Sequence, residues 1–394
     1  MRHYLQKELF GEGGSIWQFA VTPTTSLFSF IAAIALSHLF TPGEYGVYRY
    51  ILAWTILSSF FTLSGSNLAV TQAALDGADN TFFSVVRKRI LFGAVGSLFF
   101  FCLAGYYYIQ GNTELAALFA IYSPFVVISE SLTSYLAFLT GKKKLRTTFF
   151  FEFLSTFTIT LSVILAAYFN AGIFVVVLVN LFATFFVRLI GTMYTLQFVS
   201  KKSLSQDVTL YSSKLTLFNG FETATQFVDK VIIFHFLGAD GLAFYVFAII
   251  FVDQIREFFR IVIFKKIFLE SHENISKENA LLRAKITLYA IAAFVLYGVG
   301  APYLYSIFFP NYVEVVMYSI VYALSFFTAF LYVPMYTYQR ERKTRQYGFH
   351  QMFIFVATVL CLTVGASSYG LAGAIVGLLV TKVMSSLVSL VLYK

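Results

Sequence analysis

Residues 16–40 read IWQFAVTPTTSLFSFIAAIALSHLF, a run of 25 residues that contains no Lys, Arg, Asp or Glu. An α-helix rises about 1.5 Å per residue, so about 20 apolar residues suffice to cross the hydrocarbon core of a bilayer. Comparable apolar runs occur at 91–109, 173–187 and 371–393. The first run has no small-residue cleavage site after it, so we expect it to be retained as a helix. The sequence therefore predicts an integral membrane protein that crosses the bilayer many times.

The composition of the whole chain agrees with this prediction. Of 394 residues, 59% are hydrophobic and only 12% are charged, whereas a soluble domain carries about 25% charged residues. The 48 Phe and 26 Tyr leave too little polar material to cover a water-soluble globule. Cys102 and Cys361 lie singly in apolar runs, so neither a disulfide framework nor a metal site is expected. Composition thus excludes a soluble enzyme.

The apolar pattern predicts an all-α membrane protein with about 12 transmembrane helices. The predicted spans are 16–40, 46–69, 90–109, 114–139, 149–169, 172–198, 210–237, 242–264, 286–308, 314–337, 347–368 and 371–393. The residues left over form only short loops, with no room for a separate extramembrane domain. We expect two six-helix lobes, residues 1–198 and 199–394.

The orientation is predicted from where Lys and Arg fall, because cytoplasmic loops are enriched in both. They concentrate in every second loop and at the termini: Arg2, Lys7, Arg87, Lys88, Arg89, Lys142, Lys143, Lys144, Arg146, Lys201, Lys202, Lys265, Lys266, Lys277, Arg283, Lys285, Arg340, Arg342, Lys343, Arg345 and Lys394. The alternate loops contain no Lys or Arg. Both termini are therefore expected in the cytoplasm. The net charge of +9 is explained by this asymmetry and does not indicate a nucleic-acid partner.

The turn after the first span is repeated after the seventh. Residues 38–48 read HLFTPGEYGVY, and residues 235–245 read HFLGADGLAFY. The two copies are 197 residues apart, which is half the chain, and an even number of predicted spans separates them. Both halves would then enter the membrane in the same direction, as in a parallel repeat with a binding site where the halves meet.

Several charged residues fall inside predicted spans, where a charge costs at least about 2.5–3.5 kcal/mol and usually faces a cavity or an opposite charge. The basic ones are Arg49, Arg188, Lys214, Lys230, Arg256, Arg260 and Lys382, and the acidic ones are Glu130, Glu152, Glu222, Asp229, Asp253 and Glu257. Asp253, Arg256, Glu257 and Arg260 follow i, i+3, i+4, i+7 spacing, which is one helical face. Glu222, Thr225, Gln226 and Asp229 repeat that spacing in the seventh span.

Two interpretations of these polar faces stay open. They line a hydrated cavity, or the charges of the eighth span pair within their own helix at i, i+3 while Arg260 extends to the interface. The acids of the seventh span have no basic residue on their own face, which favours the cavity there. Lys382 lies near the predicted midplane without an acid in its span, so it faces the cavity or pairs with an acid such as Glu130.

Proline residues mark positions where a helix can bend, since each removes one i to i−4 hydrogen bond. Pro23 lies among Thr22, Thr24 and Thr25, whose hydroxyls can pair with the freed carbonyls. We interpret it as a hinge that flexes during transport, or alternatively as a fixed packing kink. Pro124, Pro302 and Pro334 are predicted to kink later spans.

The twelve spans, the repeat and the turn Leu39-Phe40-Thr41-Pro42-Gly43-Glu44-Tyr45-Gly46-Val47-Tyr48 resemble the polysaccharide transporter branch of the multidrug/oligosaccharidyl-lipid/polysaccharide (MOP) exporter superfamily. Within it the chain is most similar to Wzx-type O-antigen flippases. The second copy of the turn, at residues 235–245, also contains an acidic residue (Asp240) and ends in a tyrosine (Tyr245), but its glycine lies at a different position. The resemblance implies a MATE/MOP-like fold whose two lobes alternate between inward-open and outward-open states, with the first, second, seventh and eighth spans lining the cavity.

The resemblance further implies translocation of an undecaprenyl-diphosphate-linked oligosaccharide across the bacterial inner membrane, for O-antigen and lipopolysaccharide biosynthesis. The anionic headgroup would be attracted by the cations Arg256, Lys382, Arg188, Arg49 and Lys230. The carboxylates of Asp229, Glu222 and Asp253 would be candidates for a coupling H⁺ or Na⁺. The implied partners are polymerase and chain-length proteins of the same pathway.

Two other functions are compatible with the sequence. A drug or cation antiporter is motivated by the acids of the seventh and eighth spans, but the basic residues at depth disfavour a cationic cargo. A membrane enzyme, such as an O-antigen polymerase or acyltransferase, is disfavoured because every outer loop is short and no HxxxD or DxD motif is present. We therefore expect a transporter without an organic cofactor.

Overall fold

The computed structural model describes residues 14–63, 65–200, 208–265, 275–331 and 344–393, and all regular elements within these ranges are helices. By contact they form two compact units: unit 1 comprises Met1–Leu39 and Trp54–Gly220, and unit 2 comprises Phe40–Ala53 and Phe221–Lys394. Two of the three unit boundaries thus fall inside helices, the third lies at the end of the first helix, and residues 40–53 group with the later part of the chain. The division into lobes at 198/199 stays a prediction.

Seven of the described helices are long and apolar enough to cross a membrane. This confirms an all-α membrane protein, while the count of 12 spans and the side on which the termini lie stay predictions. Two of the seven contain a glycine with left-handed backbone angles, Gly238 (φ 71°) in α10 (Val208–Lys265) and Gly370 (φ 60°) in α14 (Thr344–Tyr393). Both glycines lie at predicted boundaries between spans, where only a residue without Cβ turns the chain without strain.

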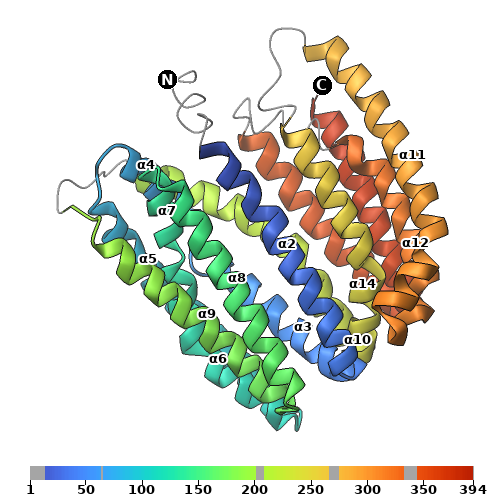
Figure 1. Cartoon of the computed structure of the whole chain (residues 1–394), viewed down its shortest axis with the longest axis horizontal. Helices are drawn as coiled ribbons and strands as arrows, with labels where there is room; N and C mark the ends of the chain where they lie inside the picture. The colour runs from blue at the N-terminus through green and yellow to red at the C-terminus, as the bar shows by residue number, and fades with distance from the viewer. Residues whose placement is uncertain (1–13, 64, 201–207, 266–274, 332–343, 394) are drawn as a thin grey trace. The chain divides into compact units, whose positions relative to one another are not determined.

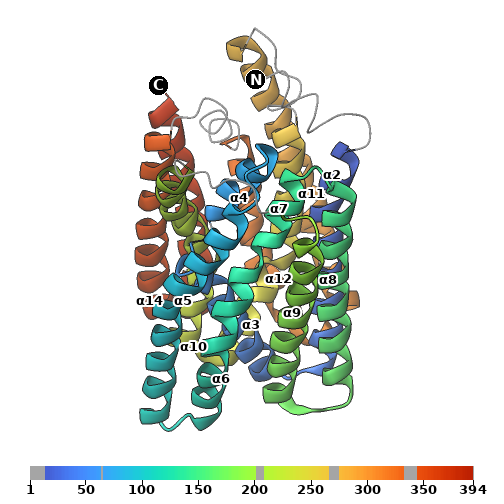
Figure 2. The ribbon, with the colours of Figure 1, turned by 90° about the vertical axis from the view of Figure 1, so that its left-hand side faces the viewer.

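Unit 1 is a bundle of helices that pack side by side (Figure 1). Its helices are α2 (Gly14–Leu39), α4 (Ser66–Leu75), α5 (Thr81–Ile109), α6 (Thr113–Leu132), α7 (Ser134–Gly141), α8 (Leu145–Tyr168) and α9 (Gly172–Leu196). The main contacts join α5 to α6, α2 to α8 and α8 to α9. The short helices α4 and α7 lie together at one end of the unit (Figure 2).

Two predicted spans of unit 1 are interrupted in the structure. The span 46–69 becomes α3 (Pro42–Leu57), the 3₁₀ turn η1 (Ser58–Phe60) and α4, while the span 114–139 becomes α6 and α7. The second interruption lies at Thr133, and not at Pro124, through which α6 continues. Each interruption frees backbone carbonyls that need other hydrogen-bond donors.

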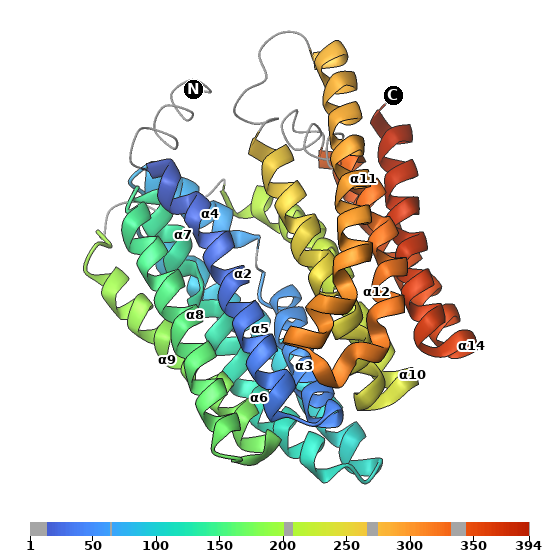
Figure 3. The ribbon, with the colours of Figure 1, turned by 45° about the vertical axis from the view of Figure 1, so that its right-hand side comes forward.

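In unit 2, α12 (Val316–Ala323) packs against α11 (Ile275–Phe308) and α14 (Figure 3). The 3₁₀ segment η4 (Leu324–Leu331) contacts all three helices, and η3 (Pro310–Val315) contacts α11 and α12. Its core is rich in aromatic residues: Tyr245, Phe247, Tyr305 and Phe309 are fully buried. The predicted proline kinks at Pro302 and Pro23 lie inside α11 and α2, and Pro334 lies outside the described residues.

The turn that carries the family resemblance is a helix N-terminus. The Thr41 hydroxyl and amide both donate to the Glu44 carboxylate at 2.9 Å, and the Glu44 amide donates back to the Thr41 hydroxyl at 3.3 Å. This is a capping box, and Pro42 occupies the first helical position, where its missing N–H costs nothing. The pattern Thr-Pro-Gly-Glu therefore starts α3.

The residues after the cap pack on the second copy of the turn, inside unit 2. The Tyr45 ring is buried and stacks on Phe247 with 4.5 Å between ring centroids. Gly46 lies against Ala239 so closely that a Cβ built on Gly46 would be 1.8 Å from the Ala239 carbonyl oxygen. The two repeated turns, far apart in sequence, therefore contact each other backbone to backbone.

Three loops of unit 1 meet at the buried carboxylate of Asp79. Lys142 lies 2.6 Å from one oxygen, and the Ser200 amide and hydroxyl donate to the other at 3.1 and 2.9 Å. Burial acts to raise the pKa of Asp79, but the hydrogen bonds from Lys142 and Ser200 outweigh it, so the pKa lies below its ordinary value. The carboxylate joins the loop after α4 to the loops after α7 and α9.

Asp79→Ala is expected to lower the free energy of unfolding by about 1–3 kcal/mol at neutral pH, the usual cost of removing a charged hydrogen-bond partner. Because the folded-state pKa is depressed, the carboxylate stabilises the fold above the unfolded pKa of about 3.9. This contribution is lost as the pH falls through the folded pKa. Unfolding of the purified protein at pH 7 and below pH 4 measures both effects. Asp76→Ala, at an exposed carboxylate in the same loop, is the control; an equal loss there would contradict the assignment.

Candidate functional site

Charged side chains within the predicted spans gather in one cluster of unit 1 and two of unit 2. The cluster of unit 1 consists of Arg89, Arg188, Glu130 and Glu152, and we call it the Arg89 cluster. Arg89 lies on α5, which begins at Thr81, well before the predicted span 90–109. Arg89 was predicted to lie in a loop; this is wrong, because the longer helix carries it into the core, where it is 1% exposed. The cluster shows how unit 1 accommodates its buried charges.

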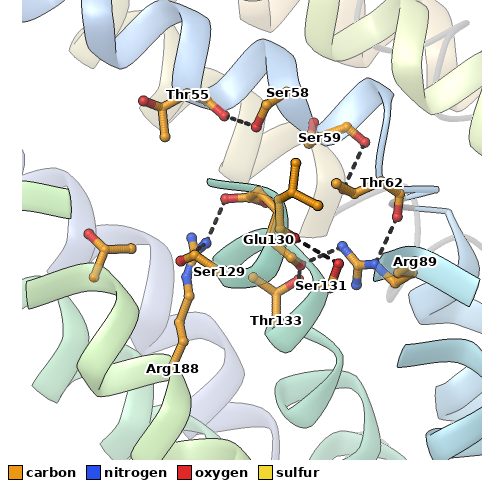
Figure 4. A network of polar contacts seen from close by, with 12 residues as sticks. Thr55, Ser58, Ser59, Thr62, Arg89, Ser129, Glu130, Ser131, Thr133 and Arg188 are labelled. Carbon is orange, nitrogen blue, oxygen red and sulfur yellow. Dashed lines mark hydrogen bonds and ion pairs between the residues drawn. The ribbon is translucent and has the colours of Figure 1, made fainter. Parts of the chain in front are cut away.

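Arg89 satisfies the carbonyls that the two helix interruptions set free. Its guanidinium donates to Thr62 O at 2.8 Å and to Glu130 O at 2.7 Å, which lie just after η1 and near the end of α6 (Figure 4). It also donates to Asn67 Oδ1 and Ser134 Oγ, on α4 and α7. A planar guanidinium offers five donors in a fixed fork, which suits it to hold several acceptors at once.

Arg188 on α9, a predicted binder of the anionic cargo, approaches the same cluster from the other side (Figure 4). It lies 2.6 Å from Glu130 Oε1 and donates to Ser129 Oγ at 3.2 Å. Glu152 also interacts electrostatically with Arg188. Two cations thus face two acids, so the Arg89 cluster is charge-balanced, and Glu130, the partner considered for Lys382, pairs with Arg188.

The Lys382 cluster of unit 2 begins with the adjacent residues Asp229 and Lys230 on α10. The Lys230 ammonium lies 2.9 Å from both carboxylate oxygens of Asp229 and donates to Gln226 O at 3.1 Å. Tyr245 donates its hydroxyl to Asp229 at 2.9 Å. The seventh span has no basic residue on the helical face of its acids, but Asp229 pairs with the adjacent residue Lys230, whose side chain folds back to the carboxylate.

The second pair of the Lys382 cluster is Asp253 and Arg256, also on α10. Their side chains approach to 3.6 Å, and the Tyr322 hydroxyl joins them by donating to Asp253 at 2.9 Å and accepting from Arg256 at 3.0 Å. Glu257 and Arg260 form an ion pair one turn further. The expected i, i+3 pairs within the eighth span are therefore present.

Lys382, on α14, completes the cluster without a direct partner. Among the described residues no hydrogen bond or ion pair reaches its ammonium, although it interacts electrostatically with Arg256, Asp253, Asp229 and Lys230. Among the described residues of this cluster, three cations therefore face two carboxylates, which leaves one positive charge in excess. Arg49 on α3 adds a guanidinium whose Nε is buried without a hydrogen-bond partner in the described part of the chain.

The His350 cluster lies elsewhere in unit 2, between α10 and α14. Glu222, a predicted coupling-ion residue, accepts a hydrogen bond from the Tyr347 hydroxyl. His350, one turn after Tyr347, is 4% exposed and contacts the carbonyl of Ser385 at 3.1 Å through Nε2. Sequence reasoning missed His350 because the coupling-ion candidates were the carboxylates of the seventh and eighth spans; the i, i+3 spacing of His350 from Tyr347 was the available signal.

In the part of the chain that the structure describes, no three His, Cys, Asp or Glu side chains gather as metal ligands. The carboxylate of Asp229, a predicted coupling-ion residue, already accepts from Lys230 and Tyr245. Pro23, the predicted hinge, is exposed on α2, and its hinge role stays a prediction.

Comparison with known proteins places this geometry in context. Residues 35–295 match a family model described as "Polysaccharide biosynthesis protein". No curated protein matches the chain in sequence. Among solved structures, an inward-facing multidrug resistance MATE family transporter of the MOP superfamily is similar, with a TM-score of 0.68, 12% identity and 93% of each chain covered.

Two further solved structures share the fold. A MOP superfamily transporter from Pyrococcus furiosus has a TM-score of 0.64 at 12% identity, covering 96% of this chain and 93% of that one. The Vibrio cholerae MATE transporter VcmN has a TM-score of 0.58 at 14% identity, covering 100% of this chain and 97% of that one. The predicted MATE/MOP-like fold is thereby confirmed, and identities this low carry the fold alone.

Proposed function

Because the chain belongs to the polysaccharide biosynthesis protein family, we propose that it is a flippase for an undecaprenyl-diphosphate-linked oligosaccharide, such as an O-antigen repeat unit. It would carry this lipid from the cytoplasmic to the periplasmic leaflet of a bacterial inner membrane by alternating access. The polymerase and chain-length proteins of the pathway would act on the exported unit, and H⁺ or Na⁺ would drive export.

The excess positive charge of the Lys382 cluster is the observation that carries this proposal. An uncompensated charge inside a membrane protein is costly, so such residues mark substrate or ion pathways. A diphosphate supplies oxygen acceptors for an ammonium and for guanidinium groups, and charged hydrogen bonds of this kind are among the strongest in proteins. Lys230 and Arg256 then stay paired with Asp229 and Asp253, while the ammonium of Lys382 binds the diphosphate of the cargo.

Arg49 and Arg188 differ in their suitability for the same task. Arg49 offers a guanidinium that its own unit leaves incompletely paired. Arg188 already pairs with Glu130 at 2.6 Å, and binding a phosphate would require exchange of that partner. We therefore rank Lys382 first and Arg49 second among the candidate cargo-binding residues, with Arg188 as a residue that orients Glu130.

The first test is the sidedness of lipid-linked oligosaccharides in the inner membrane of a deletion strain. Completed units accumulating on the cytoplasmic leaflet, with loss of surface polymer, are expected of a flippase. Single units that reach the surface unpolymerised would indicate a polymerase instead. Unchanged intermediates together with increased drug susceptibility would favour a drug antiporter, a function that the excess of cations in unit 2 disfavours.

Lys382→Ala is expected to reduce transport about 10- to 100-fold, because a hydrogen bond to a charged group contributes about 1.5–3 kcal/mol. Removing this charge also leaves two cations facing two carboxylates, so the variant is expected to fold. Surface polymer and cytoplasmic-leaflet intermediates measure the effect in a complemented deletion strain. Lys285→Ala, at an exposed lysine of α11 in the same unit, is the matched control. Full transport by Lys382→Ala at wild-type protein level would remove Lys382 from the site.

A further inference from the structure

His350 is an ionisable side chain buried in a membrane-spanning helix of unit 2, and no function assigned so far uses it. It is 4% exposed, and its Nε2 lies 3.1 Å from the carbonyl oxygen and 3.3 Å from the hydroxyl of Ser385. Both His350 and Ser385 belong to α14, on opposite sides of the turn at Gly370. An ionisable residue buried within a candidate membrane span is by default a candidate functional group.

The contacts with Ser385 bear on which ring nitrogen takes up a proton. We assign the hydrogen of the neutral ring to Nε2, because Nε2 then donates to the Ser385 carbonyl at 3.1 Å, the shorter of its two contacts. The lone pair is then on Nδ1. Uptake of a proton forms an Nδ1–H bond and converts the imidazole into an imidazolium, and the reverse step returns the proton to water without any redox partner. Histidine makes this change between about pH 5 and 8, within the physiological range.

A carboxylate from a second helix faces this ring. Glu222 on α10 interacts electrostatically with His350, and its orientation is held by the hydroxyl of Tyr347. No other charged group among the described residues acts on His350 in this way. With a neutral imidazole the cluster carries one negative charge, and with an imidazolium it is neutral. A proton taken up by His350 thus removes the unbalanced charge of this buried cluster.

The His350 cluster is also close in sequence to the candidate cargo site. Ser385 follows Lys382 by three residues on α14, and the hydroxyl of Ser386 donates to the Lys382 carbonyl. Residues three apart on a helix lie on neighbouring positions of one face. The segment that receives the hydrogen bond from His350 is therefore the segment that positions Lys382.

We propose that His350, together with Glu222, forms the proton-binding site that couples export to a proton gradient. This proposal rests on the flippase function and identifies the driving ion as H⁺, taken up at Nδ1 of His350. Glu222 stabilises the imidazolium and Tyr347 positions Glu222. Na⁺ has no comparable site here, since the described carboxylates of the Lys382 cluster already pair with Lys230 and Arg256.

The test uses the full-length protein in proteoliposomes with a fluorescent undecaprenyl-diphosphate sugar as the probe. A tenfold proton gradient is expected to raise the steady-state ratio of cargo between the leaflets about tenfold for wild type, if one proton exchanges per cargo. His350→Gln keeps an N–H donor for Ser385 but cannot titrate. It is expected to equilibrate cargo between leaflets while losing the response to the gradient. His235→Gln, at an exposed histidine of α10, is the matched control.

A second readout does not depend on cargo. In ¹⁵N NMR of histidine-labelled protein in nanodiscs, one imidazole titration is expected to disappear in His350→Gln, and Glu222→Gln is expected to lower the pH at which it occurs. If His350→Gln responds to the gradient as wild type does, the proton site is wrong while the flippase function stands. If wild type moves no cargo in either direction, the flippase function fails, and a titrating His350 alone would not rescue the coupling role.

Discussion

Arg89→Met is expected to lower the free energy of unfolding by about 3–5 kcal/mol, as when one partner of a buried charged network is removed. Methionine fills a similar volume but donates no hydrogen bond. It would remove the donor to the Thr62 carbonyl. The Glu130 carbonyl and Asn67 Oδ1 would lose one donor each and keep only their hydrogen bonds from Thr133 and Ser134. Each buried acceptor left unpaired costs about 1–3 kcal/mol, and water entering the site recovers part of this loss.

The measurement is unfolding of the purified protein in detergent, followed by the fraction that elutes as a folded species. Arg87→Met is the matched control, since Arg87 lies two residues earlier on α5 and is exposed. Arg89→Lys should restore only part of the stability, because an ammonium has three donors for four acceptors. Equal stability of Arg89→Met and Arg87→Met would show that the helix interruptions do not depend on this guanidinium.

The burial of Arg89 could not be predicted from the sequence. The positive-inside rule assigned Arg87, Lys88 and Arg89 to one loop. The rule counts charges near the ends of apolar spans, and it does not detect that a helix can begin before its apolar span does. The structure starts α5 at Thr81, so Arg87 is exposed and Arg89 is buried on the same helix. The burial of Arg89 depends on carbonyls that are freed at two helix interruptions elsewhere in unit 1. The sequence around Arg89 does not predict these interruptions.

The fold class and the periodic charge pairs were predictable for a physical reason. Apolar runs must match the thickness of a bilayer, and i, i+3 neighbours must meet on a helix, so both follow from local sequence. The pair of Asp253 and Arg256 was predictable in this way. The contact of Lys230 with Asp229 was not, because adjacent residues point to different sides of a helix and meet only when a long side chain folds back.

The candidate sites depend on contacts between residues far apart in sequence. Tyr322 connects Asp253 with Arg256 from a separate helix, and Ser385 meets His350 across the turn at Gly370. Sequence reasoning ranked Lys382 as a cavity residue because its span contains no acid. In the structure, the neighbouring acids Asp229 and Asp253 already pair with Lys230 and Arg256. Residue spacing alone does not predict this pairing around Lys382, because it depends on how the helices pack.

Among the described glycines, Gly46→Ala is expected to have the largest effect of any glycine-to-alanine change. The added Cβ would lie 1.8 Å from the Ala239 carbonyl oxygen and 2.5 Å from the carbonyl carbon, where real Cβ atoms do not approach. The clash is with backbone, so no side-chain rotation relieves it. Overpacking in a core typically costs about 1–3 kcal/mol, and a backbone displacement costs more. We expect little folded protein and loss of surface polymer in a complemented deletion strain.

The control is Gly298→Ala on α11 of the same unit, where a Cβ meets nothing within 4 Å. An alanine there is expected to be neutral or stabilising by up to about 1 kcal/mol, since alanine has the higher helix propensity. If Gly46→Ala were as stable and active as Gly298→Ala, the close packing of the two repeated turns would be wrong. If it folds poorly, the glycine of the Glu-Tyr-Gly turn is explained by packing: Glu44 starts the helix, Tyr45 stacks on Phe247, and Gly46 admits the backbone of the second copy.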